Sequence, residues 1–317
     1  MRLITMGTGP FAVPMFQQLY EARHDVALLV TRPLRSHRGK EVEPASAMRD
    51  IAHEHATPIY DPESINTLEA QQYLTGIGAD LLVVCDYGQI LSPETLSTAR
   101  LGGINLHGSL LPKYRGAAPI NWALLNGDPE TGVTVIHMTP KVDAGPCIAQ
   151  AVTLIGPEET AFELETTLAE SGGWLVRRAI DALVGGRLEA LPQNPALASK
   201  APRLKKTDGA IDWARPASSI KNQIRGLEPW PRTYTFWHRT QGTPIRMILG
   251  PVDVVDLSNS PYPPGTVLEA SGERLVIAAG QGAVAPRTVQ LAGKRFMGIS
   301  ELLRGHKIQP GERFGQE

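Results

Sequence analysis

Over its first half the chain alternates short runs of aliphatic residues with stretches of helical periodicity. This alternation predicts an α/β domain, in which a mostly parallel sheet is flanked by crossover helices. The run at 81–85 is apolar at every position, as expected for a strand that is buried on both faces of such a sheet. The other strands predicted in this half are at 3–6, 26–30, 104–107 and 133–138.

A long helix and a proline-rich stretch follow this domain. The helix is expected to begin after Thr160, because Thr160 and Glu163 form a capping box. It is expected to end at Gly185-Gly186, with Gly172-Gly173 as a point where it can break. The stretch 191–207 contains three prolines and no hydrophobic periodicity, so we predict a linker there.

The chain after this stretch has a different pattern of residues. After a short helix at about 216–225, short strands alternate with turn residues, which predicts a small all-β barrel. These strands are expected at 233–237, 245–249, 266–269, 274–278 and 288–291. The predicted organisation is therefore a first domain at 1–190, a linker at 191–207 and a second domain at 208–317.

Charge is distributed unevenly along the chain, although the formal net charge is only −1. Residues 1–202 carry 15 Lys and Arg against 22 Asp and Glu, whereas residues 203–317 carry 16 against 10. An acidic first part followed by a basic second part favours a polyanionic partner.

The sequence disfavours a protein stabilised by disulfides or zinc, and it disfavours a membrane-spanning or secreted protein. The two cysteines, Cys85 and Cys147, provide neither a disulfide framework nor a four-ligand zinc site, and no other cluster has metal-ligand spacing. No apolar run approaches the roughly 18 residues that cross a bilayer, and the N-terminus lacks the apolar region of a signal peptide. We therefore expect no metal and a cytoplasmic protein.

The turn after the first strand has the pattern of a dinucleotide site. Residues 7–12 read Gly-Thr-Gly-Pro-Phe-Ala, which matches G-x-G-x-x-A. Arg32 at the end of the second strand would suit an NADP enzyme. Pro10, however, removes one N–H donor from the turn, and no acidic residue ends the second strand. An NADP-binding oxidoreductase is therefore one alternative.

A more informative set of polar residues follows two later strands. Asn105 and His107 alternate along one strand and should share a face near its carboxyl end, where ligands bind in open α/β sheets. Asp143 follows the next strand and could reach His107. Such a set can hold an amine, carry its proton and stabilise an oxyanion, which predicts direct acyl transfer without a Ser or Cys nucleophile. Asn105 could instead satisfy a buried backbone group, and Asp143 could be an ordinary turn carboxylate.

The turn beside His107 completes this pattern. Ser109-Leu110-Leu111-Pro112 offers an apolar ledge with main-chain polar groups, which suits a flat heteroaromatic ring. With the flanking residues it belongs to a longer set of motifs, at 6–14, 38–40, 86–91, 104–119, 127–134, 142–145, 205–213, 229–231, 265–268 and 293–295. Together these segments resemble the folate-dependent formyltransferases, and among them the branch that formylates initiator tRNA.

The resemblance implies a Rossmann-like catalytic domain followed by an OB-like barrel. It implies transfer of the formyl group of 10-formyltetrahydrofolate, a co-substrate, to the α-amino group of methionine on initiator Met-tRNA. Asn105, His107 and Asp143 are then the catalytic residues: Asn105 and protonated His107 stabilise the oxyanion, and Asp143 holds His107. The folate site is implied to include Ser109, Leu110, Leu111, Pro112, Tyr87, Gly88, Gln89, Ile90 and Leu91.

For the tRNA we predict phosphate contacts by basic residues from both domains, namely Arg35, Arg38, Lys40, Lys205, Lys206, Lys294 and Arg295. In the family the loop after the second strand contacts the acceptor end of the tRNA. Here that loop, 32–40, is one residue shorter than usual before its Arg-Gly-Lys, and Pro146 stands where an acidic residue often follows Asp-x-Gly. We expect a monomer.

The sequence leaves a second acceptor of the formyl group open. A purine-pathway formyltransferase would lack the second domain, but sugar formyltransferases can carry a similar one. An amino sugar nucleotide is therefore the alternative acceptor.

Overall fold

The structure is a computed structural model that describes residues 1–22, 24–33, 35–37, 40–42, 46–186, 189–240, 242–257 and 261–317. The chain divides into two compact units. The first comprises Met1–Pro119, Glu130–Leu154 and Leu164–Pro202, and the second comprises Ile120–Pro129, Ile155–Glu163 and Arg203–Glu317. In the part of the chain so described, no helix is long and apolar enough to cross a membrane.

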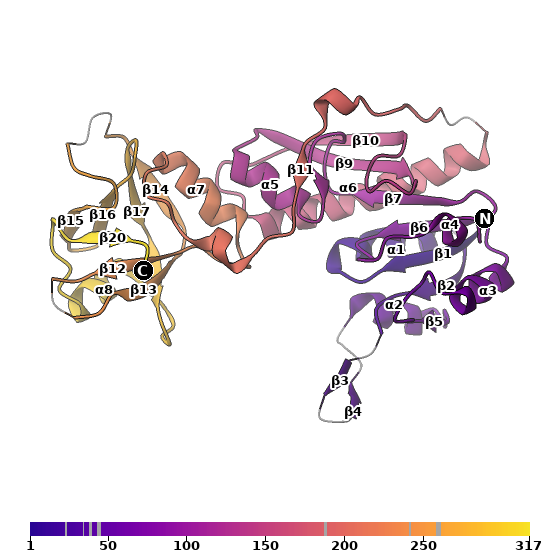
Figure 1. The fold of residues 1–317 in the computed structure, drawn as a ribbon, viewed down its shortest axis with the longest axis horizontal. Helices are drawn as coiled ribbons and strands as arrows, with labels where there is room; N and C mark the ends of the chain where they lie inside the picture. Colours follow the sequence, from indigo (N-terminus) through magenta and orange to yellow (C-terminus); the bar gives the residue numbers. More distant parts are fainter. Residues whose placement is uncertain are drawn as a thin grey trace. The chain divides into compact units, whose positions relative to one another are not determined.

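A seven-stranded sheet organises the first unit (Figure 1). Its strand order is β10-β9-β7-β6-β1-β2-β5. The five strands from β7 to β5 run parallel to one another, whereas β9 pairs antiparallel with both β7 and β10. The bounds are β1 Arg2–Gly7, β2 Asp25–Val30, β5 Ile59–Tyr60, β6 Leu81–Cys85, β7 Gly103–His107, β9 Glu130–His137 and β10 Cys147–Leu154. The expectation of a mostly parallel, Rossmann-like sheet is confirmed.

Alternation along the strands sends side chains to two helical layers. Ile4 and Met6 of β1 share a core cluster with Ile65, Ala70 and Leu74 beside helix α3. The strand β6 is buried at all five positions, as its apolar sequence requires. The helices that lie wholly or mostly in this unit are α1 Val13–Glu21, α2 Ala47–Glu54, α3 Leu68–Ile77, α4 Pro93–Leu96 and α6 Ala161–Val184.

Helix α6 runs unbroken through Gly172-Gly173. A Cβ atom at Gly172 would lie 2.6 Å from the Leu106 side chain, and one at Gly173 would lie 3.0 Å from the Pro14 backbone. The two glycines therefore bring α6 close to β7 and α1 rather than ending the helix. The capping box forms as predicted, with Thr160 N donating to Glu163 Oε2 at 2.9 Å and Glu163 N donating to Thr160 Oγ1 at 3.3 Å.

The second unit contains two antiparallel sheets, ordered β19-β18-β13-β12-β20 and β14-β17-β16-β15. Two chain segments pass from one sheet to the other, β13–β14 and β17–β18, and they are joined where Gly250 N donates to the Thr288 carbonyl. A bridge between Thr266 and Arg313 joins the sheets again, so the strands close on themselves. The bounds are β12 Tyr234–His238, β13 Ile245–Leu249, β14 Val252–Val255, β15 Val267–Ser271, β16 Arg274–Ala278, β17 Ala283–Pro286, β18 Thr288–Leu291, β19 Phe296–Gly298 and β20 Arg313–Gly315, with helices α5 Pro119–Asn126, α7 Ala217–Gly226 and α8 Ile299–Gly305.

Residues 191–202 belong to the first unit. They contain the short helix η2, Pro195–Leu197, and the strand β11, Lys200–Ala201, which pairs in parallel with β8, Arg115–Gly116. The next short helix, η3 at Lys206–Gly209, lies in the second unit. The boundaries that we expect at 190 and 207 stay predictions.

Candidate active site

Strand β7 carries Asn105 and His107 to the carboxyl edge of the sheet. Asn105 pairs with Val84 of β6 and Ile136 of β9, and His107 pairs with Thr134. The pairing is regular through both residues, so their side chains share the face opposite Leu106. His107 is 6% exposed and Asn105 is partly exposed.

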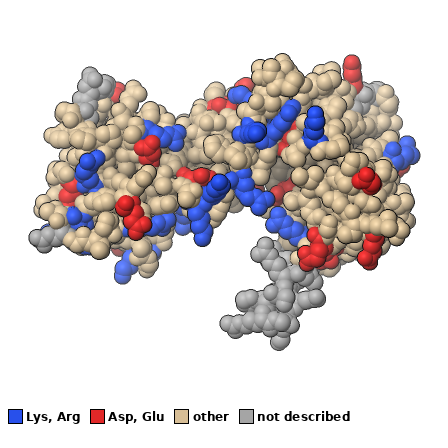
Figure 2. Space-filling model, viewed as in Figure 1, with Lys and Arg blue, Asp and Glu red and all other residues tan. Residues whose placement is uncertain are grey.

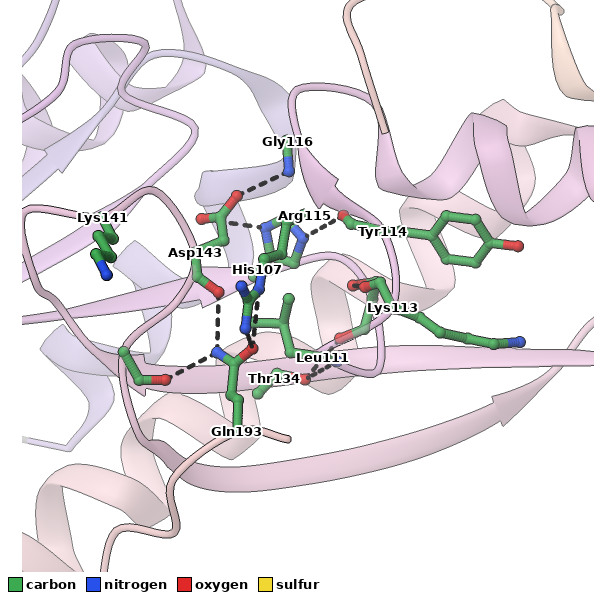
Figure 3. Close-up of polar contacts among 12 residues, drawn as sticks. His107, Leu111, Lys113, Tyr114, Arg115, Gly116, Thr134, Lys141, Asp143 and Gln193 are labelled. Atoms are coloured by element: carbon green, nitrogen blue, oxygen red, sulfur yellow. Dashed lines mark hydrogen bonds and ion pairs between the residues drawn. The ribbon is translucent and has the colours of Figure 1, made fainter. Parts of the chain in front are cut away.

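Both nitrogens of His107 face groups that can orient the ring (Figure 3). Its Nε2 lies 2.9 Å from the main-chain carbonyl oxygen of Tyr114, and a carbonyl only accepts, so Nε2 carries the proton of this bond. Its Nδ1 lies 3.7 Å from Oδ1 of Asp143. The carbonyl therefore fixes the tautomer of the neutral ring and leaves Nδ1 as the edge that faces the carboxylate.

Asp143 is held in a conformation that few side chains adopt. Its φ is +50°, in the left-handed region that Asp tolerates better than most residues. Its Oδ2 accepts a hydrogen bond from Gly116 N at 2.9 Å, and its side chain is 13% exposed. One carboxylate oxygen is thus anchored, and the other faces His107.

A dense hydrogen-bond network shapes the turn after β7. Thr134 Oγ1 donates to the Ser109 carbonyl at 2.6 Å and accepts from Leu111 N at 3.0 Å. Gln150 Nε2 donates to the Leu111 carbonyl at 2.8 Å, and Ser109 Oγ donates to the Lys113 carbonyl at 2.7 Å. The main-chain groups of Leu111 are therefore used within the protein, and Ser109 and Leu111 are buried. Leu110 and Pro112 are the partly exposed residues of the predicted ledge.

The predicted second folate wall, 87–91, presents backbone and one apolar side chain. Tyr87 is 2% exposed, burial raises its pKa to about 12, and its hydroxyl is without a hydrogen-bond partner among the described residues. Leu91 is also buried, and Gln89 Oε1 accepts from Ile65 N. Gly88 has a φ of +83°, and Ile90 is 64% exposed. Gly88 and Ile90 are thus the accessible part of this segment.

Three consecutive residues that the sequence analysis did not single out hold the site together. Tyr114 accepts from His107, Arg115 contacts Gln193, and Gly116 donates to Asp143. Gln193 lies in the predicted linker, and only its long-range contacts identify it. The signal in the sequence was the position of 114–116 within the motif at 104–119, directly after the ledge, but no role in the site was predicted for them.

The predicted tRNA residues fall in different places. Arg35 and Lys40 lie on the paired strands β3, Arg35–His37, and β4, Lys40–Val42, whereas Arg38 lies outside the described residues. In the second unit Lys205, Lys206, Lys294 and Arg295 are exposed. On the face shown in Figure 2, Lys and Arg side chains recur with Asp and Glu among them.

The two segments that carry the four exposed cations of the second unit each contact Arg232 through a neighbouring residue. A Cβ atom at Gly209, in the turn after Lys205 and Lys206, would lie 2.1 Å from the Arg232 carbonyl oxygen. The Arg232 guanidinium lies 5.4 Å from the ring centroid of Phe296, which follows Lys294 and Arg295. Arg246 lies 4.1 Å from the Tyr234 ring centroid. Cations and aromatic rings are thus interleaved on this part of the second unit.

Within the described ranges, no group of three or more His, Cys, Asp and Glu could hold a metal ion.

The chain matches the formyl transferase family over residues 1–180 and the formyl transferase C-terminal domain over residues 203–307. It is 44% identical to a methionyl-tRNA formyltransferase of Rhodopirellula baltica, an alignment that covers 99% of this chain and 96% of the relative. It is 36% identical to the enzyme of that name from Geobacter sulfurreducens, over 100% of this chain and 97% of the relative.

Solved structures show the same fold at lower identity. An N-formyltransferase from Helicobacter canadensis, in complex with folinic acid and dTDP-3-aminofucose, superposes with a TM-score of 0.64 at 18% identity, covering 90% of this chain and 98% of that one. HypX from Aquifex aeolicus in complex with tetrahydrofolic acid has a TM-score of 0.59 at 15% identity, covering 95% of this chain and 46% of that one.

Proposed function

The chain belongs to the methionyl-tRNA formyltransferase family, and from this membership we propose its reaction and the residues that perform it. The protein transfers the formyl group of 10-formyltetrahydrofolate to the α-amino group of methionine on initiator Met-tRNA. The relatives named for this activity match nearly the whole chain at 36–44% identity, whereas the amino-sugar enzyme shares 18%. A tRNA acceptor is therefore favoured over a sugar, and membership in this family also displaces the NADP-binding alternative.

The assignment of the catalytic residues rests on one observation, the pairing of His107 at the end of β7 with Asp143. The imidazole and the carboxylate face each other at 3.7 Å, and each is anchored on its far side by main chain, at Tyr114 and Gly116. A ring and a carboxylate fixed in this way keep their orientation while protons move between the substrates.

In the proposed mechanism the methionine amine attacks the formyl carbon, and the carbonyl electrons move to oxygen. Asn105 donates a hydrogen bond to this oxyanion. His107 acts through Nδ1, because its Nε2 proton is already given to the Tyr114 carbonyl; protonated at Nδ1, it is the second donor. Once the amine nitrogen has bonded to the formyl carbon it carries a positive charge, and Asp143 receives the proton that this nitrogen releases and returns it to N10 as the bond between the carbon and N10 breaks.

For the folate we propose a ring site between the partly exposed Leu110–Pro112 ledge and the 88–90 backbone. Ile90 and Leu110 offer apolar side chains, and the backbone of Gly88 is accessible. Flat heteroaromatic rings bind in sites of this kind, which combine apolar walls with a few main-chain polar groups.

For the tRNA we propose that Lys205, Lys206, Arg232, Lys294 and Arg295 contact phosphates, with Arg35, Arg38 and Lys40 at the acceptor end. Interleaved cations and aromatic rings suit a nucleic acid, because the cations bind phosphates and the rings offer stacking surfaces. The protein is proposed to act as a monomer in the cytoplasm.

One assay with three arms tests the proposed function. Purified protein is given labelled 10-formyltetrahydrofolate with charged initiator tRNA, with a dTDP-amino sugar, or with NADPH and no acceptor. Label incorporated into Met-tRNA at a rate far above that into the sugar is the expected result. Preferential labelling of the sugar, or NADPH oxidation without transfer, would refute the proposal.

A further inference from the structure

Gln193 extends its side chain to the loop that carries Asp143 (Figure 3). Its Nε2 donates to the main-chain carbonyl oxygens of Asp143 and Gly145, each at 2.8 Å. Its Oε1 accepts from Arg115, from Nε at 3.1 Å and from Nη2 at 2.6 Å. Both donors and both lone pairs of the amide are thus used, and the charged donor on one side fixes which way the amide points.

These bonds close a ring of contacts around the carboxylate. Arg115 binds the amide of Gln193 with its side chain, while the next residue, Gly116, donates its N–H to Asp143 Oδ2. The Asp143 backbone is therefore held from one side and its carboxylate from the other. Closed polar networks of this kind fix geometry more strongly than their separate bonds.

The backbone on either side of Gln193 is itself anchored. Leu191 and Cys147 exchange two main-chain hydrogen bonds, each at 2.8 Å. Ser199 Oγ accepts from Tyr114 N at 2.9 Å, and Arg115 N donates to the Ser199 carbonyl at 2.9 Å. The amide of Gln193 is consequently presented from a fixed frame rather than from a free strand of linker.

The loop that it holds needs such support. Asp143 lies in the left-handed region, and a residue in that region keeps its conformation only where its surroundings impose it. A shift of the loop would change the 3.7 Å spacing between Asp143 Oδ1 and His107 Nδ1, on which the proposed proton transfers depend.

We propose that Gln193 is a positioning residue for formyl transfer: with Arg115 it clamps the left-handed loop so that Asp143 faces His107. This inference rests on the proposed function and extends the site to a residue of the stretch after α6. Gln193 touches no reacting atom in this arrangement, because all of its hydrogen-bonding capacity is spent inside the protein.

Two substitutions test the clamp. Gln193→Glu keeps the acceptor for Arg115 but places an oxygen against two carbonyl oxygens, and Gln193→Met keeps the length without any hydrogen bond. We expect each to lower kcat about 10- to 100-fold, as displaced supporting groups typically do, with the KM values for folate and tRNA within about twofold of wild type. Asn194→Ala is the matched control, since among the described residues that side chain bonds only to the nearby Ala196 N, and it should leave kcat unchanged.

The same substitutions are then made in Asp143→Asn protein. If Gln193 acts through the carboxylate, Gln193→Glu should cost little further activity there, because residues that act as a unit are strongly non-additive. The inference is overturned if Gln193→Glu lowers kcat as much in Asp143→Asn protein as it does in the wild type. It is also overturned if the single variants at Gln193 keep the wild-type kcat. Inactivity of the wild type would instead refute the proposed function. A crystal structure of Gln193→Glu tests the clamp without activity, and an unmoved loop at 139–146 would count against it.

Discussion

The Nε2 atom of His107 lies 2.9 Å from the carbonyl oxygen of Tyr114, seven residues later in the chain. The peptide that follows β7 therefore folds back to hold the imidazole of that same strand. One nitrogen of the ring is used in this main-chain contact, and the other faces Asp143. In the proposed mechanism Asn105 is therefore the oxyanion donor that does not change its protonation state.

Replacing that donor should affect turnover far more than binding. Asn105→Ala is expected to lower kcat on the order of 10²–10³-fold, as the loss of one oxyanion donor does, while folate affinity changes little. Steady-state kinetics with charged initiator tRNA, together with folate binding measured by fluorescence, separate the two effects. An unchanged kcat would remove Asn105 from the proposed mechanism.

Gly145 should be intolerant of any side chain for a purely steric reason. A Cβ atom there would lie 1.7 Å from the His137 carbonyl oxygen, so Gly145→Ala must move the backbone of the Asp143 loop. A loss of about 1–3 kcal/mol in unfolding free energy is expected, measured by urea denaturation. Gly76→Ala, in α3, is the control: outside the adjacent residues and the backbone of its own helix, no described heavy atom lies within 4 Å of the added methyl, so the change should not destabilise the protein.

Low pH should lower the free energy of unfolding of the second unit through protonation of Glu312. Burial raises the pKa of this carboxyl, but hydrogen bonds from Trp237 Nε1, Gln309 N and Thr240 outweigh that effect and lower it below its usual value. A carboxyl whose pKa is depressed on folding stabilises the fold above its unfolded pKa, about 4.3, and this contribution is lost as pH falls through the folded pKa.

We therefore expect the unfolding free energy to decline below about pH 4.5. The decline should be shallower in Glu312→Gln, which keeps an acceptor oxygen but does not titrate. Denaturation curves of both proteins between neutral pH and pH 3 provide the measurement. Parallel pH profiles for the two proteins would contradict this role of Glu312.

Binding of tRNA should depend steeply on salt. Each phosphate contact that is lost should reduce the slope of log Kd against log salt by about one. Lys294→Ala and Arg232→Ala are expected to weaken initiator tRNA binding and flatten this slope, whereas Arg274→Ala, a cation of β16 paired with Glu269, serves as the comparison. A slope that is the same in all three variants would place the tRNA elsewhere.

The strands that a reader of the sequence can place are those with a strong apolar signature. The stretch 81–85 matches β6 in both bounds, and 245–249 matches β13. Strand β10, Cys147–Leu154, was not predicted, because this antiparallel strand ends the sheet order and its side chains are partly or fully exposed, without a clear apolar run. The break expected at Gly172-Gly173 was wrong because the sequence shows only the low helix propensity of glycine. It does not show that Leu106 and Pro14 pack closely against these two residues.

The candidate site was predictable only in part. Asn105, His107 and Asp143 stand beside recognisable strand ends and a distinctive turn. Gln193 lies 50 residues from Asp143 and 78 from Arg115, in a stretch whose prolines and lack of periodicity are typical of a linker. Nothing local marks such a residue, since its role depends on contacts that exist only after the sheet has formed.

The pairing of Leu191 with Cys147 and of β11 with β8 has a consequence for how the protein is made. Every strand of the large sheet leaves the ribosome before residues 191–202 do. An amino-terminal fragment that stops where α6 ends would contain all seven of these strands and still lack the amide that braces the Asp143 loop. A self-sufficient fragment of the first unit has to extend through Pro202.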